Sequence, residues 1–151
     1  MNHLGKLVAV RFVNGTLLKG WTGDFRPDCD FFHLREQEAA GPRRVSVEGL
    51  KGVFFIKTRE GNPDHEQRKA FDDHAGPEKP IWILFTDGER LAGWSSSASS
   101  LKNGFYLVPA DPDSNLERVY VFHSAVKQFL AGDEATKASI HFGRLRVHTA
   151  S

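Results

Sequence analysis

The chain of 151 residues contains a single cysteine, and this scarcity excludes two kinds of site. Cys29 has no second cysteine with which to form an internal disulfide, and one thiol is too few for a cysteine-based metal centre. Its neighbours Asp28 and Asp30 carry negative charges that oppose formation of the thiolate. We therefore expect an ordinary structural cysteine and no nucleophile.

Long apolar runs and an excess of charge of one sign are also missing. The start, MNHLGKLVAVRF, lacks the apolar core and cleavage site of a signal peptide, and no stretch reaches the length of a membrane-spanning helix. We predict a cytoplasmic protein without membrane insertion. Twenty basic residues against nineteen acidic ones give a net charge of +1. Any binding to nucleic acid must therefore be local.

Sequence signatures of catalysis are absent as well. The chain has neither a nucleophile-elbow motif nor a glycine-rich phosphate loop. His123 and Ser124 are adjacent, and neighbours on a strand point to opposite faces, so they cannot act as a base and a nucleophile there. We predict that the protein is not an enzyme and needs no cofactor.

What the sequence does contain is an internal repeat. The segment FVNGTLLKGW, residues 12–21, returns as FTDGERLAGW, residues 85–94. The spacing that aligns Gly15 with Gly88 holds without a gap as far as Leu34 and Leu107. The positions matched on the way are Phe12 and Phe85, Asn14 and Asp87, Leu18 and Leu91, Gly20 and Gly93, Trp21 and Trp94, Phe32 and Phe105. A match of this extent predicts a duplicated unit.

Each copy has the pattern of a small β-unit. Asn-Gly and Asp-Gly supply the positive φ angles that a tight hairpin turn requires, and both lie between apolar runs. Gly20 and Gly93 fall inside the second strand, where glycine marks a sharp bend or a close backbone approach. Five short strands per copy are typical of a small Src-homology-3-like or Sm-like barrel. We therefore predict an all-β protein of two barrels packed together, a built-in pseudo-dimer expected to be a monomer.

The predicted organisation has four parts. Residues 5–57 form the first barrel and residues 79–131 form the second. Residues 58–78 are a charged linker, in which an Asn-Pro pair predicts the start of a short helix. Residues 132–151 match neither copy, and the sequence leaves open an edge strand or a frayed tail.

Several motifs together resemble a bacterial domain family of unknown function. They are FVNGTLLKGW, LKGVFFIK, GNPDHE, FTDGERLAGW, GFYLVPADPDSN and RVYVFHSAVKQF. The family is similar in having VxFxDGxxLxG, LKAVFFVK, a GNP linker, FxLxPADPxSNN and a final AVKxV segment. The resemblance covers residues 6–131, and PADPDSN is its most specific part. The chain departs from the pattern at residues 95–103 and at Leu116, where a second asparagine would stand. The resemblance implies a fold and partners or neighbours such as PilZ or response-regulator modules, but no catalytic residue.

Aromatic and loop residues supply the predicted interaction surface. Trp21 and Trp94 repeat in register, which favours packing in the core or between the copies, with a surface role as the alternative. The other members of the predicted surface are Tyr106, Asp111 and Asn115.

The possible metal ligands do not reach a standard pattern. Asp111, Asp113 and Asn115 have the spacing of the first three ligands of a calcium loop, but the required Gly and Glu are missing further along. We expect these residues to shape a loop through bonds to the backbone. His65 and His74 in the linker show no standard ligand spacing, so no metal site is predicted.

The basic clusters are small. Arg43 and Arg44 form one, and Arg144 and Arg146 form the other. They are the nucleic-acid contacts of an alternative function, an Sm-like RNA-binding protein. An arginine pair at a strand edge also discourages pairing with another edge.

The leading functional hypothesis is a module that binds another protein within bacterial signalling. It follows from the duplicated aromatic-rich unit, the missing catalytic residues and the family resemblance. The alternatives are the RNA-binding protein and a small-molecule sensor with a pocket between the repeats.

Overall fold

The structure is a computed structural model and describes residues 5–37, 39–58, 78–95, 103–111 and 113–139. The strands of the first half are β1 (Lys6–Phe12), β2 (Leu17–Thr22), β3 (Phe31–Leu34), β4 (Arg43–Ser46) and β5 (Leu50–Ile56). The second half contains β6 (Lys79–Phe85), β7 (Arg90–Ser95), β8 (Gly104–Pro109), β9 (Leu116–Phe122), the 3₁₀ turn η1 (His123–Ala125) and β10 (Val126–Ala131). Residues 133–139 are helical. The prediction of a mainly β protein is confirmed.

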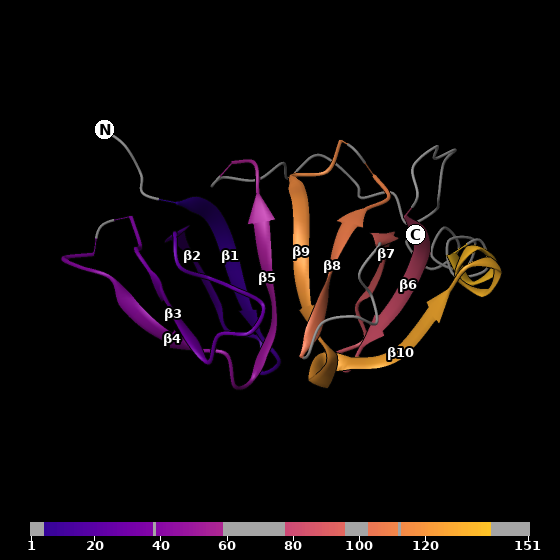
Figure 1. The fold of residues 1–151 in the computed structure, drawn as a ribbon, viewed down its shortest axis with the longest axis horizontal. Coiled ribbons are helices and arrows are strands. Elements are labelled where there is room, and N and C mark those ends of the chain that lie inside the picture. Colours follow the sequence, from indigo (N-terminus) through magenta and orange to yellow (C-terminus); the bar gives the residue numbers. More distant parts are fainter. Residues whose placement is uncertain (1–4, 38, 59–77, 96–102, 112, 140–151) are drawn as a thin grey trace, which may run out of the picture.

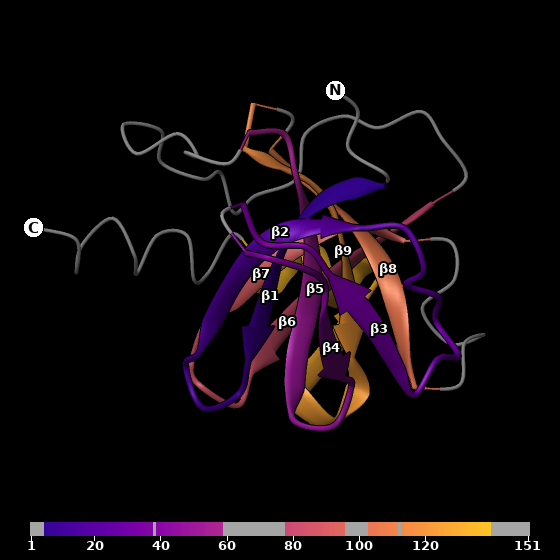
Figure 2. The same cartoon turned by 90° about the vertical axis from the view of Figure 1, so that its left-hand side faces the viewer.

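Eight strands form one antiparallel sheet in the order β10-β6-β7-β8-β9-β5-β1-β2, and β3 and β4 form a separate hairpin. The halves lie side by side along the long axis, with β5 next to β9 in the middle (Figure 1). Figure 2 turns the first half toward the reader and places the β3–β4 hairpin in front of the central strands. An isolated bridge between Trp21 and Arg35 links β2 to the end of β3. Within the described ranges, no strand pairing closes either half into a barrel.

The two halves have the same strand connectivity. In each half the first strand pairs with the second and the fifth, since β1 pairs with β2 and β5 while β6 pairs with β7 and β10. The hairpin turns contain Gly15 and Gly88, both with a φ of 95°. A side-chain oxygen of Asn14 accepts a hydrogen bond from the N–H of Thr16, and Asp87 does the same for Glu89. Both turns therefore form as the sequence predicts.

The glycine in each second strand is required by a close backbone approach. A Cβ atom on Gly20 would lie 2.3 Å from the carbonyl oxygen of Arg35, and one on Gly93 would lie 2.3 Å from that of Val108. The close approach predicted for both glycines is confirmed.

Each half completes the core of the other. Tyr120 and Phe122 of β9 pack into the core of the first half, whereas Ala9 and Phe54 of the first half pack into the core of the second. The remaining core residues are Val8, Val10, Phe32, Leu34, Val45, Leu50, Val53 and Phe55 in the first half, and Ile81, Ile83, Phe85, Leu91, Phe105, Leu107, Val119, Val121 and Ala125 in the second. Because side chains alternate along a strand, β5 and β9 can supply both cores at once.

The helix at residues 133–139 was missed by the sequence analysis. Its buried Ala135 packs against Trp82 and Ala92, on the face of β6 and β7 that points away from the core of the second half. The stretch carries no large apolar residue, so its pattern shows no helical periodicity. The edge strand considered for IHFGRLRV and the predicted linker helix lie outside the described residues.

The glycine contacts predict a specific loss of stability. We expect Gly93→Ala to lower the free energy of unfolding by about 1–3 kcal/mol, because the new methyl group would overlap a backbone oxygen. Urea unfolding measures the change. Gly41→Ala is the control, since no atom lies within 4 Å of its added Cβ. Equal effects of the two substitutions would contradict the close-approach explanation.

Candidate functional site

An open hollow of about 260 Å³ lies between the two halves, and we call it the inter-half groove. It is lined by Ala9, Arg11, Leu17, Lys19, Phe54 and Ile56 of the first half and by Glu89, Leu91, Ser114, Asn115 and Leu116 of the second. The lining combines apolar side chains with the charged Arg11, Lys19 and Glu89, each of which is partly exposed. Leu17 is 48% exposed, so it presents an apolar surface to the solvent.

Strand register explains how the wall of the groove is formed. Ala9 is the partner of Lys19 across to β2 and of Phe54 across to β5. Partners directly opposite one another in an antiparallel sheet point to the same face. These three side chains therefore form a row on the face of the first half that is directed away from its own core.

A buried lysine joins the halves beside the groove. The side chain of Lys51, in β5, is only 3% exposed. Its Nζ donates a hydrogen bond to Asp87 Oδ2 at 2.8 Å and another to Glu89 Oε1, both at the hairpin turn of the second half. Glu89 Oε1 also lies 3.5 Å from a guanidinium nitrogen of Arg11. The buried ammonium group is thus paired with two carboxylates, which offsets the cost of removing its charge from water.

The electrostatic environment holds Asp87 in its charged form. Partial burial acts to raise the pKa of this carboxyl group, but the hydrogen bonds from Lys51 and from the N–H of Glu89 outweigh it. The pKa of Asp87 therefore lies below its ordinary value.

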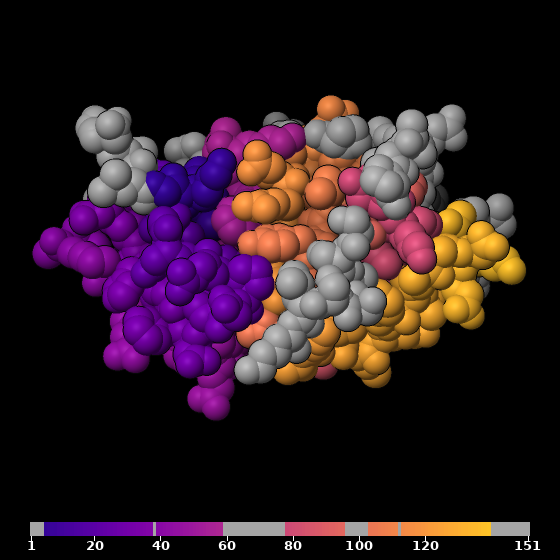
Figure 3. Space-filling model, in the orientation of Figure 1, coloured from indigo at the N-terminus to yellow at the C-terminus, as the bar shows by residue number. Residues whose placement is uncertain are grey.

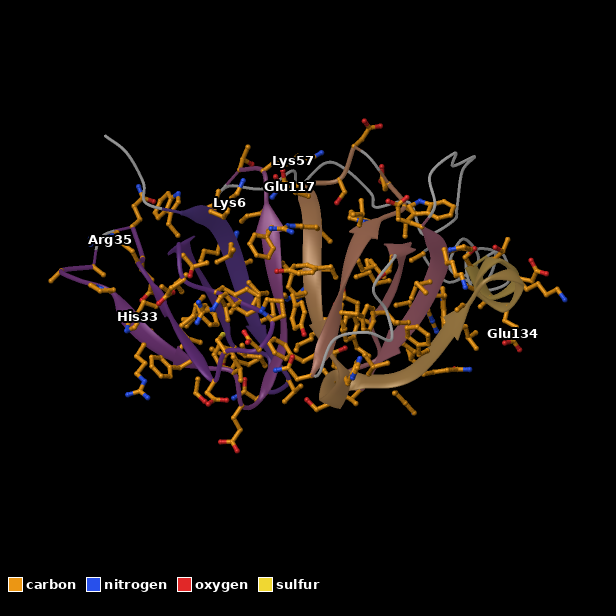
Figure 4. All side chains as sticks on the ribbon, viewed as in Figure 1. Lys6, His33, Arg35, Lys57, Glu117 and Glu134 are labelled. Atoms are coloured by element: carbon orange, nitrogen blue, oxygen red, sulfur yellow. The ribbon has the colours of Figure 1, made fainter. Side chains whose placement is uncertain are left out.

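The PADPDSN stretch forms the loop between β8 and β9 and fastens the end of β5. Asp111, which is buried, accepts a hydrogen bond from the N–H of Asp113 at 3.0 Å. Asn115 accepts hydrogen bonds from the N–H and the hydroxyl of Thr58 and donates one to its carbonyl oxygen. Figure 4 shows Lys57 and Glu117 at this same end of β5 and β9. The expected role of the loop residues in bonding the backbone is confirmed for Asp111.

Tyr106 lies at the junction of the halves on the side of the sheet that faces the core of the first half. Its ring packs against Phe55 and Tyr120, and the guanidinium carbon of Arg118 lies 4.7 Å from its centroid. Burial raises the pKa of Tyr106. Burial likewise raises the pKa of Tyr120 to about 12, and its hydroxyl donates to Asn103 Oδ1 at 2.6 Å.

The two tryptophans occupy corresponding strand positions. Trp21 pairs with Leu7 across to β1, and Trp94 pairs with Pro80 across to β6. Both are partly buried. Trp21 lies on the face of the first half that carries Lys19, and Trp94 lies on the face of the second half that carries Ala92. Trp21 is therefore next to the groove without lining it.

The β3–β4 hairpin carries the first arginine pair. Arg43 Nε donates to Glu36 Oε1 at 2.9 Å, and the guanidinium carbon of Arg44 lies 3.9 Å from the ring centroid of Phe31. On the same hairpin, His33 Nδ1 lies 2.7 Å from Asp24 Oδ2. Arg144 and Arg146 lie outside the described residues.

Metal ligands and membrane-spanning segments give no further candidate site. In the part of the chain that the structure describes, no group of three or more His, Cys, Asp or Glu side chains is placed to hold a metal ion. No helix in that part has the length and apolarity needed to cross a membrane. His65 and His74 lie outside it.

Residues 5–132 match the family of unknown function DUF6982. The chain belongs to this family. No curated protein and no solved structure matches the chain. The DUF6982 match covers both halves, so the inter-half groove lies within the family region.

Of the residues predicted for an interaction surface, Asn115 lines the groove, and sequence reasoning missed the other residues that build this site. Lys51 carried a visible signal, because it is a lysine inside the apolar run LKGVFFI. Its partners Asp87 and Glu89 lie far along the chain. The sequence analysis assigned Asp87 only a role in forming the hairpin turn. Leu17 follows the first hairpin turn and carries no sequence signal of exposure.

The lysine pairing predicts a difference between two equivalent lysines. We expect Lys51→Met to lower the free energy of unfolding by about 1 kcal/mol, because it removes the ammonium group that pairs with two partly exposed carboxylates. Lys127 occupies the corresponding position of β10 and is exposed, so Lys127→Met should change stability by less than about 0.5 kcal/mol. Chemical unfolding of the full chain compares them. A loss of similar size in both variants would contradict the role of Lys51.

The lowered pKa of Asp87 predicts a pH dependence. A carboxyl group whose pKa is lower in the folded state than in the unfolded state stabilises the fold above the unfolded pKa of about 3.9, and this contribution is lost as the pH falls through the folded value. We expect Asp87→Asn to show a shallower loss of stability on acidification below about pH 4. Urea unfolding across this range measures it. The pKa of Asp24 is also lowered, because its bonds to His33 and Thr22 outweigh burial, so part of the slope should remain. Parallel curves for wild type and variant would refute the contribution of Asp87.

Proposed function

We propose that this DUF6982 protein is a non-enzymatic module that binds another protein through the inter-half groove. The observation that carries the proposal is the exposure of Leu17 at 48% beside apolar side chains that both halves supply. A compact apolar centre with a polar rim is the ordinary anatomy of a protein-recognition surface. The family resemblance supports a role in bacterial signalling.

The size and shape of the groove favour a protein over a small molecule. Pockets for small ligands enclose about 300–1,000 Å³ and surround most of the ligand. The groove has about 260 Å³ and is open to solvent. It suits a few side chains of a larger partner, so the sensor alternative receives less support.

The proposal includes two copies of one small barrel-like unit. The shared connectivity, the paired hairpin turns and the glycine contacts of β2 and β7 support a duplication. The isolated bridge from β2 to β3 supports a barrel-like arrangement of the first unit. Charged residues on β4 discourage pairing with a further chain, which supports a monomer.

The RNA-binding alternative has weaker support. Arg43 and Arg44 are neighbours on a strand, so they point to opposite faces. Each is also engaged within the chain, one by Glu36 and the other over Phe31. This arrangement does not supply the basic stripe that phosphate binding requires.

Affinity capture from host extract tests the proposal. The tagged full chain is compared with Leu17→Asp and with the control Val108→Asp, which alters an apolar strand residue of matched exposure, 49%, outside the groove. We expect a stoichiometric protein that survives nuclease treatment and is lost with Leu17→Asp but kept with Val108→Asp, because a carboxylate at the groove opposes apolar contact. RNA as the captured species, or a partner lost equally with both variants, would refute it.

A further inference from the structure

Strand β10 lies at the margin of the eight-stranded sheet (Figure 1). Within the described residues it pairs with β6 alone, whereas β5, the corresponding strand of the first half, has β1 on one side and β9 on the other. Six of the seven residues of β5 are buried, and four of the six residues of β10 are exposed. The outer edge of β10 therefore lacks the neighbour that the same edge of β5 has, and we call it the β10 edge.

The direction of the backbone groups shows what this edge offers. The N–H of Gly132 donates a hydrogen bond to the carbonyl oxygen of Pro80 in β6, and the register between the two strands is continuous from Gln128 onward. Backbone groups point to alternate sides along an antiparallel strand. The N–H and C=O groups of Phe129 and Ala131 therefore point away from β6. A row of such groups is a template for pairing with another strand.

A bulged lysine marks the same position in β5 and β10. The pairing of β5 with β1 skips Lys51, and the pairing of β10 with β6 skips Lys127. Lys51 is paired with Asp87 and Glu89 across the junction. Lys127 is exposed, and no ion pair among the described residues involves it. A partner at the β10 edge would therefore meet a cation that lacks the carboxylates of its counterpart.

The core of the second half is incompletely covered at the same edge. Phe129 packs edge-on against Phe105 of that core, yet it is 39% exposed. Counted from the two bulged lysines, Phe129 corresponds to Val53 of β5. Val53 is completely buried, and it pairs with Tyr120 of β9. A strand beside β10 with an aromatic residue at the position of Tyr120 would cover Phe129 in the same way.

From this correspondence we propose that the β10 edge binds an extended segment of a partner protein, which joins the sheet as an antiparallel strand in the manner of β9 beside β5. In strand addition, backbone hydrogen bonds supply affinity and alternate side chains supply specificity. No residue of β10 lines the inter-half groove, so this is a second binding surface.

The pairing of β9 with β5 defines the chemistry of the partner segment. An aromatic residue should stand opposite Phe129, as Tyr120 stands opposite Val53. Because the strands are antiparallel, the carboxyl end of the segment passes Lys127. An Asp or Glu at that end would pair with this lysine.

Two segments of the chain itself fit the β10 edge less well. Strand β4 of a second copy, the counterpart of β9, has Arg44 at the position of Tyr120, and this arginine already lies over Phe31. Residues 140–151 contain Arg144 and Arg146 but neither Asp nor Glu, so they would bring no carboxylate to Lys127. Charge complementarity thus favours a separate partner protein.

Selection from a displayed library of random peptides, each about ten residues long, tests the inference on the immobilised full chain. Peptides that also bind Phe129→Asp are removed. We expect the remainder to carry β-branched and aromatic residues followed by Asp or Glu toward the carboxyl end. Their affinity should fall about tenfold with Lys127→Glu. Val108→Asp, which alters a strand residue of similar exposure, 49%, should leave it unchanged.

Methylation of peptide nitrogens separates strand addition from other modes of binding. Only one edge of an added strand pairs with β10, so methyl groups on one set of alternate nitrogens should abolish binding, and methyl groups on the other set should not. Thermal unfolding confirms that each protein variant is folded. Equal effects of the two methylation patterns, or a gain of helicity on binding, would overturn the inference.

Other outcomes would assign the edge to a different occupant and refute the proposal. Peptides that bind only after residues 140–151 are replaced by Gly and Ser would make that segment the occupant. A concentration-dependent dimer that is lost with Phe129→Asp would make it a second copy. Failure to select any peptide dependent on Phe129 would refute this inference alone, because the test of the proposed function depends on Leu17.

Discussion

Strand β5 lies antiparallel to β9, and this pairing joins the two halves into a single sheet. Alternation along the pair sends Val53 and Tyr120 into the core of the first half and sends Phe54 and Val119 into the core of the second. Neither core is complete without the other half. Figure 3 shows the two halves as adjoining blocks of surface. Lys51 strengthens the same pairing from the side, because its ammonium group reaches the hairpin turn across the junction.

The strand positions that are apolar at the junction are polar at the outer edge of the first half. Tyr120 of β9 pairs with Tyr106, whereas the corresponding Arg44 of β4 pairs with His33. The buried Tyr120 at the junction therefore corresponds to the exposed Arg44 at the outer edge. The second half ends differently, since the helix at 133–139 covers its outer face. The end units of a repeat protein need such a polar or covered outer face, because an exposed apolar face would bind a further unit.

Local signals in the sequence predicted local structure, and contacts between distant segments could not be predicted in the same way. The Asn-Gly and Asp-Gly turns and the two strand glycines are recognisable because each depends on a few neighbouring residues. The pairing of β5 with β9 and the partners of Lys51 depend on which strands meet, and the repeat does not contain that information. The repeat does align Ala9 with Trp82, yet only the sheet shows that both side chains lie on an outward face. The exposure of Leu17 likewise depends on the packing of the two halves, because its sequence position after the first hairpin turn does not distinguish it from a half-buried strand residue.

The position of the groove at the junction determines how a ligand would act on the whole molecule. Ala9 and Phe54 belong both to the groove wall and to the core of the second half, so the groove cannot change shape without disturbing that core. A surface held in this way needs little ordering when a partner binds, which removes one of the usual costs of association. Glu89 belongs both to the groove and to the junction of the halves, because it lines the groove and also accepts a hydrogen bond from Lys51. Arg11 and Lys51 both approach Glu89 Oε1, so the wall of the groove and the pairing of the halves share one carboxylate.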